Sequence, residues 1–310
     1  MVGLSSDEIA AYERDGFLIR RGVIDAETLA SLQGVFEDAV DRLAASWVDA
    51  GVITDPAREH GFDQRWNVLR AQLPAMYATA WRRILVSPEV YALWQHPVLL
   101  ETAHELIGRD LIAHAIWNGR PRDSGGHDTQ RIHWHQDAHY YKQWDASDGK
   151  LMSAWMPLVP VNVDAGCLEL APGSHKQGLV PQVPSVNGLR TVPDEYIPAS
   201  PFIAEMEPGD VLFFTDLTLH RALDNHAGRV RWSIDIRFGE ATEPVVAKSG
   251  RGYIVSHSDA SRLESFDDWR KKYEYSLVEL GEELGADYGD GDAETIAKAI
   301  GTSALDLESY

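Results

Sequence analysis

Cysteine is almost absent from this chain of 310 residues, which contains only Cys167. A single cysteine cannot close an internal disulfide bond. It also cannot supply a zinc site built from several thiolates. Both of these stabilising devices are therefore excluded.

Basic residues are scarce relative to acidic ones. The chain has 28 Lys and Arg against 48 Asp and Glu, which gives a formal net charge of −20. A charge of this sign and size repels nucleic acid and anionic membrane surfaces, so we expect neither as a partner. Solubility is the simplest interpretation of the acidic surplus.

Long apolar runs are missing as well. No stretch approaches the roughly 18 uninterrupted apolar residues that suggest a transmembrane helix. The opening residues, Met1 to Leu4, lack the basic region and apolar run of a secretory signal. The apolar fraction of 44% and the ten tryptophans also exclude a disordered chain. The sequence therefore predicts a folded cytoplasmic protein.

Helical patterns occupy the chain up to about residue 110. Apolar residues recur at helical spacing after the capping residues Ser5 and Asp25, and two further helices are expected to begin near Pro88 and Pro97. One short strand is expected at 16–20. After residue 240 the pattern again favours helices, at 266–284 and 294–300.

Between residues 111 and 239 the apolar runs are short and separated by Gly, Pro, Asn and Asp. This pattern is typical of a barrel or a sandwich of strands. The expected strands are 111–118, 131–137, 151–160, 167–170, 211–214, 218–223 and 230–238. We therefore predict a mainly β fold with flanking helices around a double-stranded β-helix (jelly-roll, cupin-like) core. A single domain is expected over 1–310, with its core at about 111–240.

Four potential metal ligands alternate along one short segment: His133, His135, Asp137 and His139. Alternate side chains of a strand share one face, so His135 and Asp137 should point the same way. Two histidines and one carboxylate on one face of an iron ion leave positions open for O2. However, the His-x-Asp pair alone is frequent, and a polar strand end with solvated histidines also explains it.

Residues further along the chain support the metal interpretation. An apolar run ends at His220, and the next expected strand carries Arg231. A guanidinium near a metal suits the bidentate binding of a carboxylate. Arg229 and Arg237 share the face of Arg231. The alternative to a carboxylate-binding role is an ordinary arginine on the surface of a strand.

Taken together, these segments resemble the phytanoyl-CoA dioxygenase family of Fe(II)- and 2-oxoglutarate-dependent oxygenases. The resemblance covers about residues 5–240 and is densest at 131–238. The matching residues are His135–Tyr141, Ala154–Trp155, Asp164–Lys176, Pro208–Phe214, His220, Asn225 and Arg231.

The resemblance implies a complete set of iron ligands, namely His135, Asp137 and His220. It also implies that an arginine eleven residues after the last ligand binds 2-oxoglutarate, and this spacing selects Arg231 and hence His220 over His226. His133 and His139 are then expected beside the site rather than on the iron.

Three further positions concern the cosubstrate. By the same resemblance, Gln136 and Trp155 are implied as 2-oxoglutarate contacts. The family often has a hydroxyl residue two positions after the last ligand, whereas this chain has Ala222. One hydrogen bond to 2-oxoglutarate is therefore expected to be missing or supplied by another residue.

The reaction implied by the resemblance uses Fe(II), 2-oxoglutarate and O2, hydroxylates the substrate and releases succinate and CO2. We expect a small secondary-metabolite-like substrate, because an acidic chain with no basic cluster gives little reason to expect an acyl-CoA. The same cofactors also support desaturation, epoxidation or ring formation, which stay open. A halogenase is disfavoured because Asp137 occupies the position that would have to be small. From another class, a non-catalytic β-barrel binding protein remains the alternative. The substrate-binding residues and the oligomeric state are not predicted.

Overall fold

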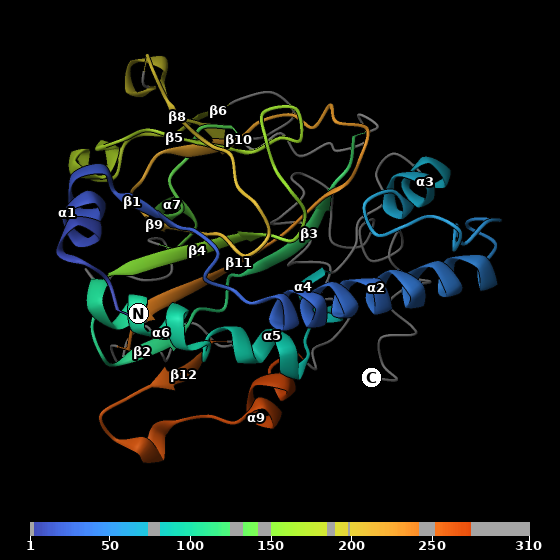
Figure 1. Ribbon diagram of the computed structural model, residues 1–310, viewed down its shortest axis with the longest axis horizontal. Coiled ribbons are helices and arrows are strands. Elements are labelled where there is room, and N and C mark those ends of the chain that lie inside the picture. The colour runs from blue at the N-terminus through green and yellow to red at the C-terminus, as the bar shows by residue number, and fades with distance from the viewer. Residues whose placement is uncertain are drawn as a thin grey trace.

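Antiparallel sheets form the centre of the computed structural model, and helices of the N-terminal part cover one side of it (Figure 1). The structure describes residues 3–73, 81–124, 133–141, 150–184, 190–197, 199–241 and 252–273. Its α-helices are α1 (Ser6–Asp15), α2 (Ala26–Asp49), α3 (Arg65–Gln72), α4 (Trp81–Ile84), α5 (Pro88–Leu93), α6 (Pro97–Leu106), α7 (Ala138–Tyr141) and α9 (Phe266–Lys271).

The larger sheet of the described chain has seven strands, in the order β1-β9-β4-β11-β2-β12, with β3 also paired to β11. These strands are β1 (Phe17–Arg20), β2 (Leu111–Ala113), β3 (Asn118–Arg122), β4 (Leu151–Pro157), β9 (Val211–Thr215), β11 (Arg231–Glu240) and β12 (Tyr253–Ser256). A smaller sheet with the order β10-β5-β8 lies above it in Figure 1. Its strands are β5 (Leu168–Leu170), β8 (Phe202–Ala204) and β10 (His220–Ala222), and a separate pair joins β6 (Val183–Pro184) to β7 (Arg190–Thr191).

Strand β11 carries different residues on its two faces because side chains alternate along a strand. Its even-numbered residues from Trp232 to Phe238 are apolar and buried, and Trp232 packs edge-on against Phe36 of α2 with ring centroids 5.4 Å apart. The odd-numbered residues from Arg231 to Arg237 are polar and face the opposite way. The core between sheet and helices is thus apolar, while the other face of the same strand is polar.

Local signals correctly predicted most of these elements. Ser5 and Glu8 form the expected capping box of α1, and Asp25 caps α2 by accepting from the backbone N–H of Thr28. Helices α5 and α6 begin at Pro88 and Pro97 as expected. The mainly β class with flanking helices is confirmed, whereas the single domain over 1–310 stays a prediction.

Two predictions of secondary structure were wrong. In place of a strand over 131–137, the described part (133–137) has only an isolated bridge at His135, and α7 follows directly. The region after residue 240, expected to be helical, contributes strand β12, which pairs with β2. The expected helix 266–284 begins as α9, but its remainder and the helix at 294–300 lie outside the described residues. Among the described residues, no helix is both long and apolar enough to cross a membrane.

Candidate metal centre

The two predicted histidine ligands are brought together by a single antiparallel bridge. The backbone N–H of His135 donates to the carbonyl of His220 at 3.0 Å, and the reverse bond measures 3.1 Å. Residues paired in this way have side chains on the same side, and the two imidazole centroids lie 4.1 Å apart. The strand β10 therefore positions His220, and the bridge positions His135 next to it.

The hydrogen bonds of these histidines determine which ring nitrogen faces the site. Nδ1 of His135 lies 2.8 Å from the carbonyl of His133, and Nδ1 of His220 lies 2.9 Å from the carbonyl of Thr218. A carbonyl can only accept, so we infer that each Nδ1 carries a proton and that each Nε2 is the ring nitrogen turned toward Asp137. Both Nε2 atoms are thus prepared to bind a metal ion.

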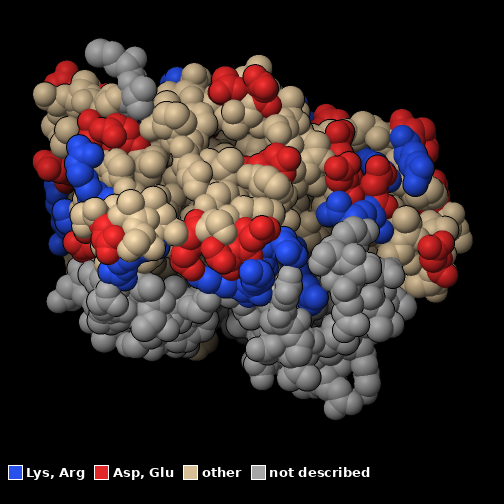
Figure 2. All heavy atoms as spheres, turned by 90° about the horizontal axis from the view of Figure 1, so that it is seen from below, with Lys and Arg blue, Asp and Glu red and all other residues tan. Residues whose placement is uncertain are grey.

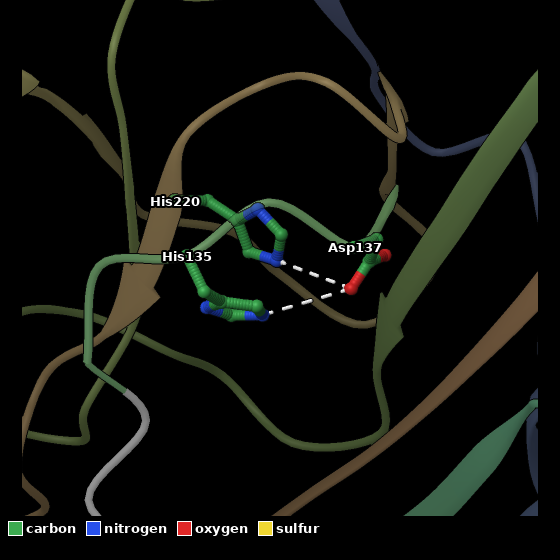
Figure 3. Close-up of side chains that lie close together, drawn as sticks. All are labelled: His135, Asp137 and His220. Atoms are coloured by element: carbon green, nitrogen blue, oxygen red, sulfur yellow. Dashed lines mark ion pairs between the residues drawn. The ribbon is translucent and has the colours of Figure 1, made fainter. Parts of the chain in front are cut away.

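Asp137 presents one carboxylate oxygen to both imidazoles (Figure 3). Its Oδ1 lies 3.6 Å from Nε2 of His135 and 3.9 Å from Nε2 of His220. The other oxygen, Oδ2, accepts a 2.8 Å hydrogen bond from the hydroxyl of Ser153 and two 3.2 Å bonds from Nε and Nη2 of Arg237. Only Oδ1 is therefore directed toward the histidines.

Electrostatics keep Asp137 and His220 in the protonation states that a metal ligand requires. Burial by itself raises the pKa of Asp137, but the charge of Arg237, assisted by His135 and His220, holds that pKa well below its usual range. Burial, with the neighbouring His135, lowers the pKa of His220 to about 3. Near neutral pH the carboxylate is ionised and the His220 imidazole is neutral, which are the forms that bind metals.

The donor set of this site fits an iron ion. One ligand atom from each of the three buried residues lies within 4.8 Å of the other two. The two Nε2 atoms and Oδ1 of Asp137 face one another, and a cation placed between them would bind to all three. Two histidines and one carboxylate are the ligands of non-haem Fe(II) oxygenases. That these three residues bind iron stays a prediction, and their geometry supports it.

Two of the three predicted cosubstrate residues lie together. The guanidinium of Arg231 lies over the ring of Trp155, 5.6 Å from its centroid, and its Nη1 donates to the carbonyl of Gly166 at 2.8 Å. Both side chains are only 4% exposed. Ala222, which stands where the family often has a hydroxyl residue, is also buried.

The third predicted cosubstrate residue, Gln136, has other partners. Its Nε2 donates to the carbonyls of Gly178 and Leu217 at 2.8 and 2.7 Å, and its Oε1 accepts from the backbone N–H of Val180 at 2.9 Å. These bonds use both amide donors and hold two loops together. A contact between Gln136 and 2-oxoglutarate stays a prediction, and the observed hydrogen bonds favour a structural role.

The other histidines considered from the sequence take no part in the described cluster. His226 is exposed, and its backbone N–H donates to the carbonyl of Asp164. Nε2 of His139 lies 2.8 Å from the carbonyl of Val180, next to the loop that Gln136 holds. The side chains of Tyr140 and Tyr141 lie outside the description.

The sequence reasoning missed the roles of Arg237 and Ser153. Alternation along the strand did place Arg237 on the face of Arg231, which was the only signal available. The partner of Arg237 depends on where the segment 135–137 lies relative to β11, and one strand pattern contains no information about that.

The family model of phytanoyl-CoA dioxygenase (PhyH) matches residues 12–233 of the chain. A probable phytanoyl-CoA dioxygenase of Caenorhabditis elegans is 25% identical over 247 residues, which cover 76% of this chain and 75% of the relative. An ectoine dioxygenase of Bordetella bronchiseptica is 27% identical over 178 residues, which cover 56% of this chain and 50% of the relative.

Solved structures show a similar fold. EvdO2 from Micromonospora carbonacea var. aurantiaca, crystallised with 2-oxoglutarate, is 18% identical and has a TM-score of 0.51 over 86% of this chain and 96% of that one. At this identity the likeness concerns the fold alone, and it agrees with the predicted arrangement of sheets and helices. The family model spans well over half of the sequence and includes His135, Asp137, His220 and Arg231. The chain therefore belongs to the phytanoyl-CoA dioxygenase family.

Proposed function

We propose that this protein is an Fe(II)- and 2-oxoglutarate-dependent oxygenase that hydroxylates a small molecule and releases succinate and CO2. The observation that carries the proposal is the convergence of two imidazole Nε2 atoms on Oδ1 of Asp137 in a buried site. Membership of the phytanoyl-CoA dioxygenase family supports the same reaction class.

Each residue of the site has a defined task in this proposal. When bound, iron and 2-oxoglutarate supply the oxidative chemistry with O2, and the protein supplies binding and orientation. His135, Asp137 and His220 hold the metal. Arg231 binds the distal carboxylate of 2-oxoglutarate through its planar fork of N–H donors. Trp155 forms a wall beside that guanidinium, and the burial of both residues keeps bulk water away from the ion pair.

Desaturation, epoxidation and ring formation use the same ligands and remain alternatives. A halogenase is disfavoured because Asp137 is present and anchored by three hydrogen bonds. A non-catalytic binding protein with this fold is the alternative from another class. It has no need to keep three ligands and a buried arginine, and this chain has all four.

We further propose a secondary-metabolite-like substrate and a cytoplasmic location. An ectoine dioxygenase and a 1-deoxypentalenic acid 11-beta-hydroxylase among the relatives support a small-molecule substrate. The net charge of −20 disfavours nucleic acid and anionic membranes. On the face that Figure 2 shows, Asp and Glu side chains are spread widely, and Lys and Arg side chains gather in a band in its lower middle.

The test is an anaerobic titration of 2-oxoglutarate into Fe(II)-loaded protein, followed by exposure to O2. We expect a weak visible charge-transfer band from the bound keto acid and then the formation of succinate, faster when a substrate is present. Absence of 2-oxoglutarate binding at any concentration in iron-loaded protein would favour the non-catalytic binding protein.

A further inference from the structure

We propose that Arg237, together with Ser153, is a positioning residue for the metal centre. Both hold Oδ2 of Asp137, so that this carboxylate offers the metal a single oxygen, Oδ1. The inference rests on the proposed function, because it takes Asp137 to be a metal ligand.

The first support is the register of the large sheet. Arg237 of β11 and Ser153 of β4 are direct partners in the antiparallel pairing, so their side chains leave the sheet on the same face, side by side. Three donors from these two residues converge on one oxygen atom, at 2.8, 3.2 and 3.2 Å. An oxygen that accepts three hydrogen bonds has no lone pair left for a metal ion.

The second support is that Arg237 is itself fixed. Its Nη1 lies 2.8 Å from Oδ2 of Asp235 and donates to the carbonyl of Ile116 at 2.9 Å. The same Asp235 oxygen accepts from Nδ2 of Asn118 at 3.1 Å, and Oδ1 of Asn118 accepts from Arg82 at 3.0 Å. This chain of bonds runs from α4 through β3 and β11 to Asp137. A side chain anchored in this way can keep a ligand in one orientation.

The third support is burial. Asp137 is 2% exposed, Ser153 1% and Arg237 7%. The guanidinium lies on the Oδ2 side of the carboxylate, whereas the histidines lie on the Oδ1 side. A positive charge near a divalent cation repels it, but here the ionised carboxylate stands between the two. We therefore expect orientation of the ligand to outweigh repulsion.

The experiment measures the affinity of the metal-free protein for Co(II), without 2-oxoglutarate and without turnover, by the visible absorption of the bound ion. Loss of a hydrogen-bonding partner of a metal ligand typically weakens metal binding about 10- to 100-fold. Arg237→Ala should lie in this range. Ser153→Ala, which removes one of the three bonds, should weaken binding less. Arg237→Lys should recover part of the loss, because an ammonium cannot reproduce the fork.

The matched control is Arg20→Ala. Arg20 is a buried arginine that contacts Glu8 at 3.4 Å and Thr102 at 3.2 Å, in a different part of the fold. This variant loses a buried guanidinium but should keep the parent's affinity for Co(II). The spectrum is a second readout, because freeing Oδ2 lets the carboxylate bind through both oxygens and changes the coordination. Arg237→Ala and Ser153→Ala should alter the Co(II) bands, and Arg20→Ala should not.

The outcomes separate this inference from the proposed function. If the parent binds Co(II) and Arg237→Ala binds it equally or more tightly with an unchanged spectrum, the positioning role is wrong while the metal site stands. If the parent binds no Co(II), both the site and the proposed function fail. Should Arg237→Ala not fold, Ser153→Ala and Arg237→Lys decide the question by the same two readouts.

Discussion

Replacing Arg231 by alanine tests the cosubstrate pocket most directly. Arg231 is 4% exposed, lies over Trp155 and begins β11 eleven residues after His220. At a buried position of this kind, a charge-assisted, bidentate bond to a carboxylate contributes roughly 1.5–3 kcal/mol or more. Each 1.4 kcal/mol is about a factor of ten in affinity. Arg231→Ala should therefore weaken 2-oxoglutarate binding about tenfold to a hundredfold or beyond.

The assay follows the visible band of iron-bound 2-oxoglutarate in an anaerobic titration of each variant. Iron affinity without cosubstrate should change little in Arg231→Ala, because the arginine is not a ligand. Arg231→Lys should recover only part of the loss, since it lacks the planar fork.

The choice of control follows from the contacts of the neighbouring arginines. Arg237 shares the face of Arg231, but it contacts Asp137 and is therefore unsuitable. Arg229→Ala serves instead, because Arg229 is half-buried and donates to the carbonyl of Pro160 at 3.2 Å. If Arg231→Ala binds 2-oxoglutarate as tightly as the parent, the cosubstrate pocket lies elsewhere and the reasoning from the spacing fails.

Three further results are expected. Asp137→Ala and His220→Ala should each abolish the visible band while His226→Ala keeps it, and a band that survives in either ligand variant would contradict the assignment. Asp137→Ala should also lower the free energy of unfolding, by less than the roughly 3–5 kcal/mol of a fully broken buried ion pair, because Asp235 still pairs with Arg237. Formate can replace the lost carboxylate, so it should restore part of the stability of Asp137→Ala in urea unfolding. If neither the substitution nor formate changes the free energy of unfolding, the buried pair of Asp137 and Arg237 is refuted. Gln136→Ala should reduce the free energy of unfolding by roughly 2–4 kcal/mol, since it removes three hydrogen bonds of about 1 kcal/mol each, and a parent-like urea midpoint would show that Gln136 does not hold the loops.

Local signals predicted the helices α1, α2, α5 and α6 and most strands of the large sheet, but not the short helices α3, α4 and α7. A cap such as Ser5 or Asp25 acts within four residues of itself, and short apolar runs between turn residues mark strands wherever their partners lie. Strand β12 was missed because it exists through its pairing with β2, far away in sequence. The prediction of a strand before Asp137 was wrong for the converse reason: the pattern suits a strand, but among the described residues 133–137 only His135 has a bridging partner.

The residues of the site were predicted from the sequence on different grounds. His135 and Asp137 were suggested by one short motif, whereas His220 and Arg231 were selected by the eleven-residue spacing that the family resemblance implies. Gln136 shows the limit of the argument, because its amide is hydrogen-bonded to the backbone of Gly178, Leu217 and Val180, and nothing in the sequence indicated these partners.

The sequence by itself determined which residues are available as ligands. A metal site is predicted from the types of its donor residues and their spacing, and both are properties of the sequence. Only the tertiary structure decided which oxygen of Asp137 faces the histidines. That choice depends on Ser153 and Arg237, which are 84 residues apart in sequence and become neighbours through the register of β4 and β11. Pairing of this kind is long-range and cooperative, so the pattern of a single strand does not contain it.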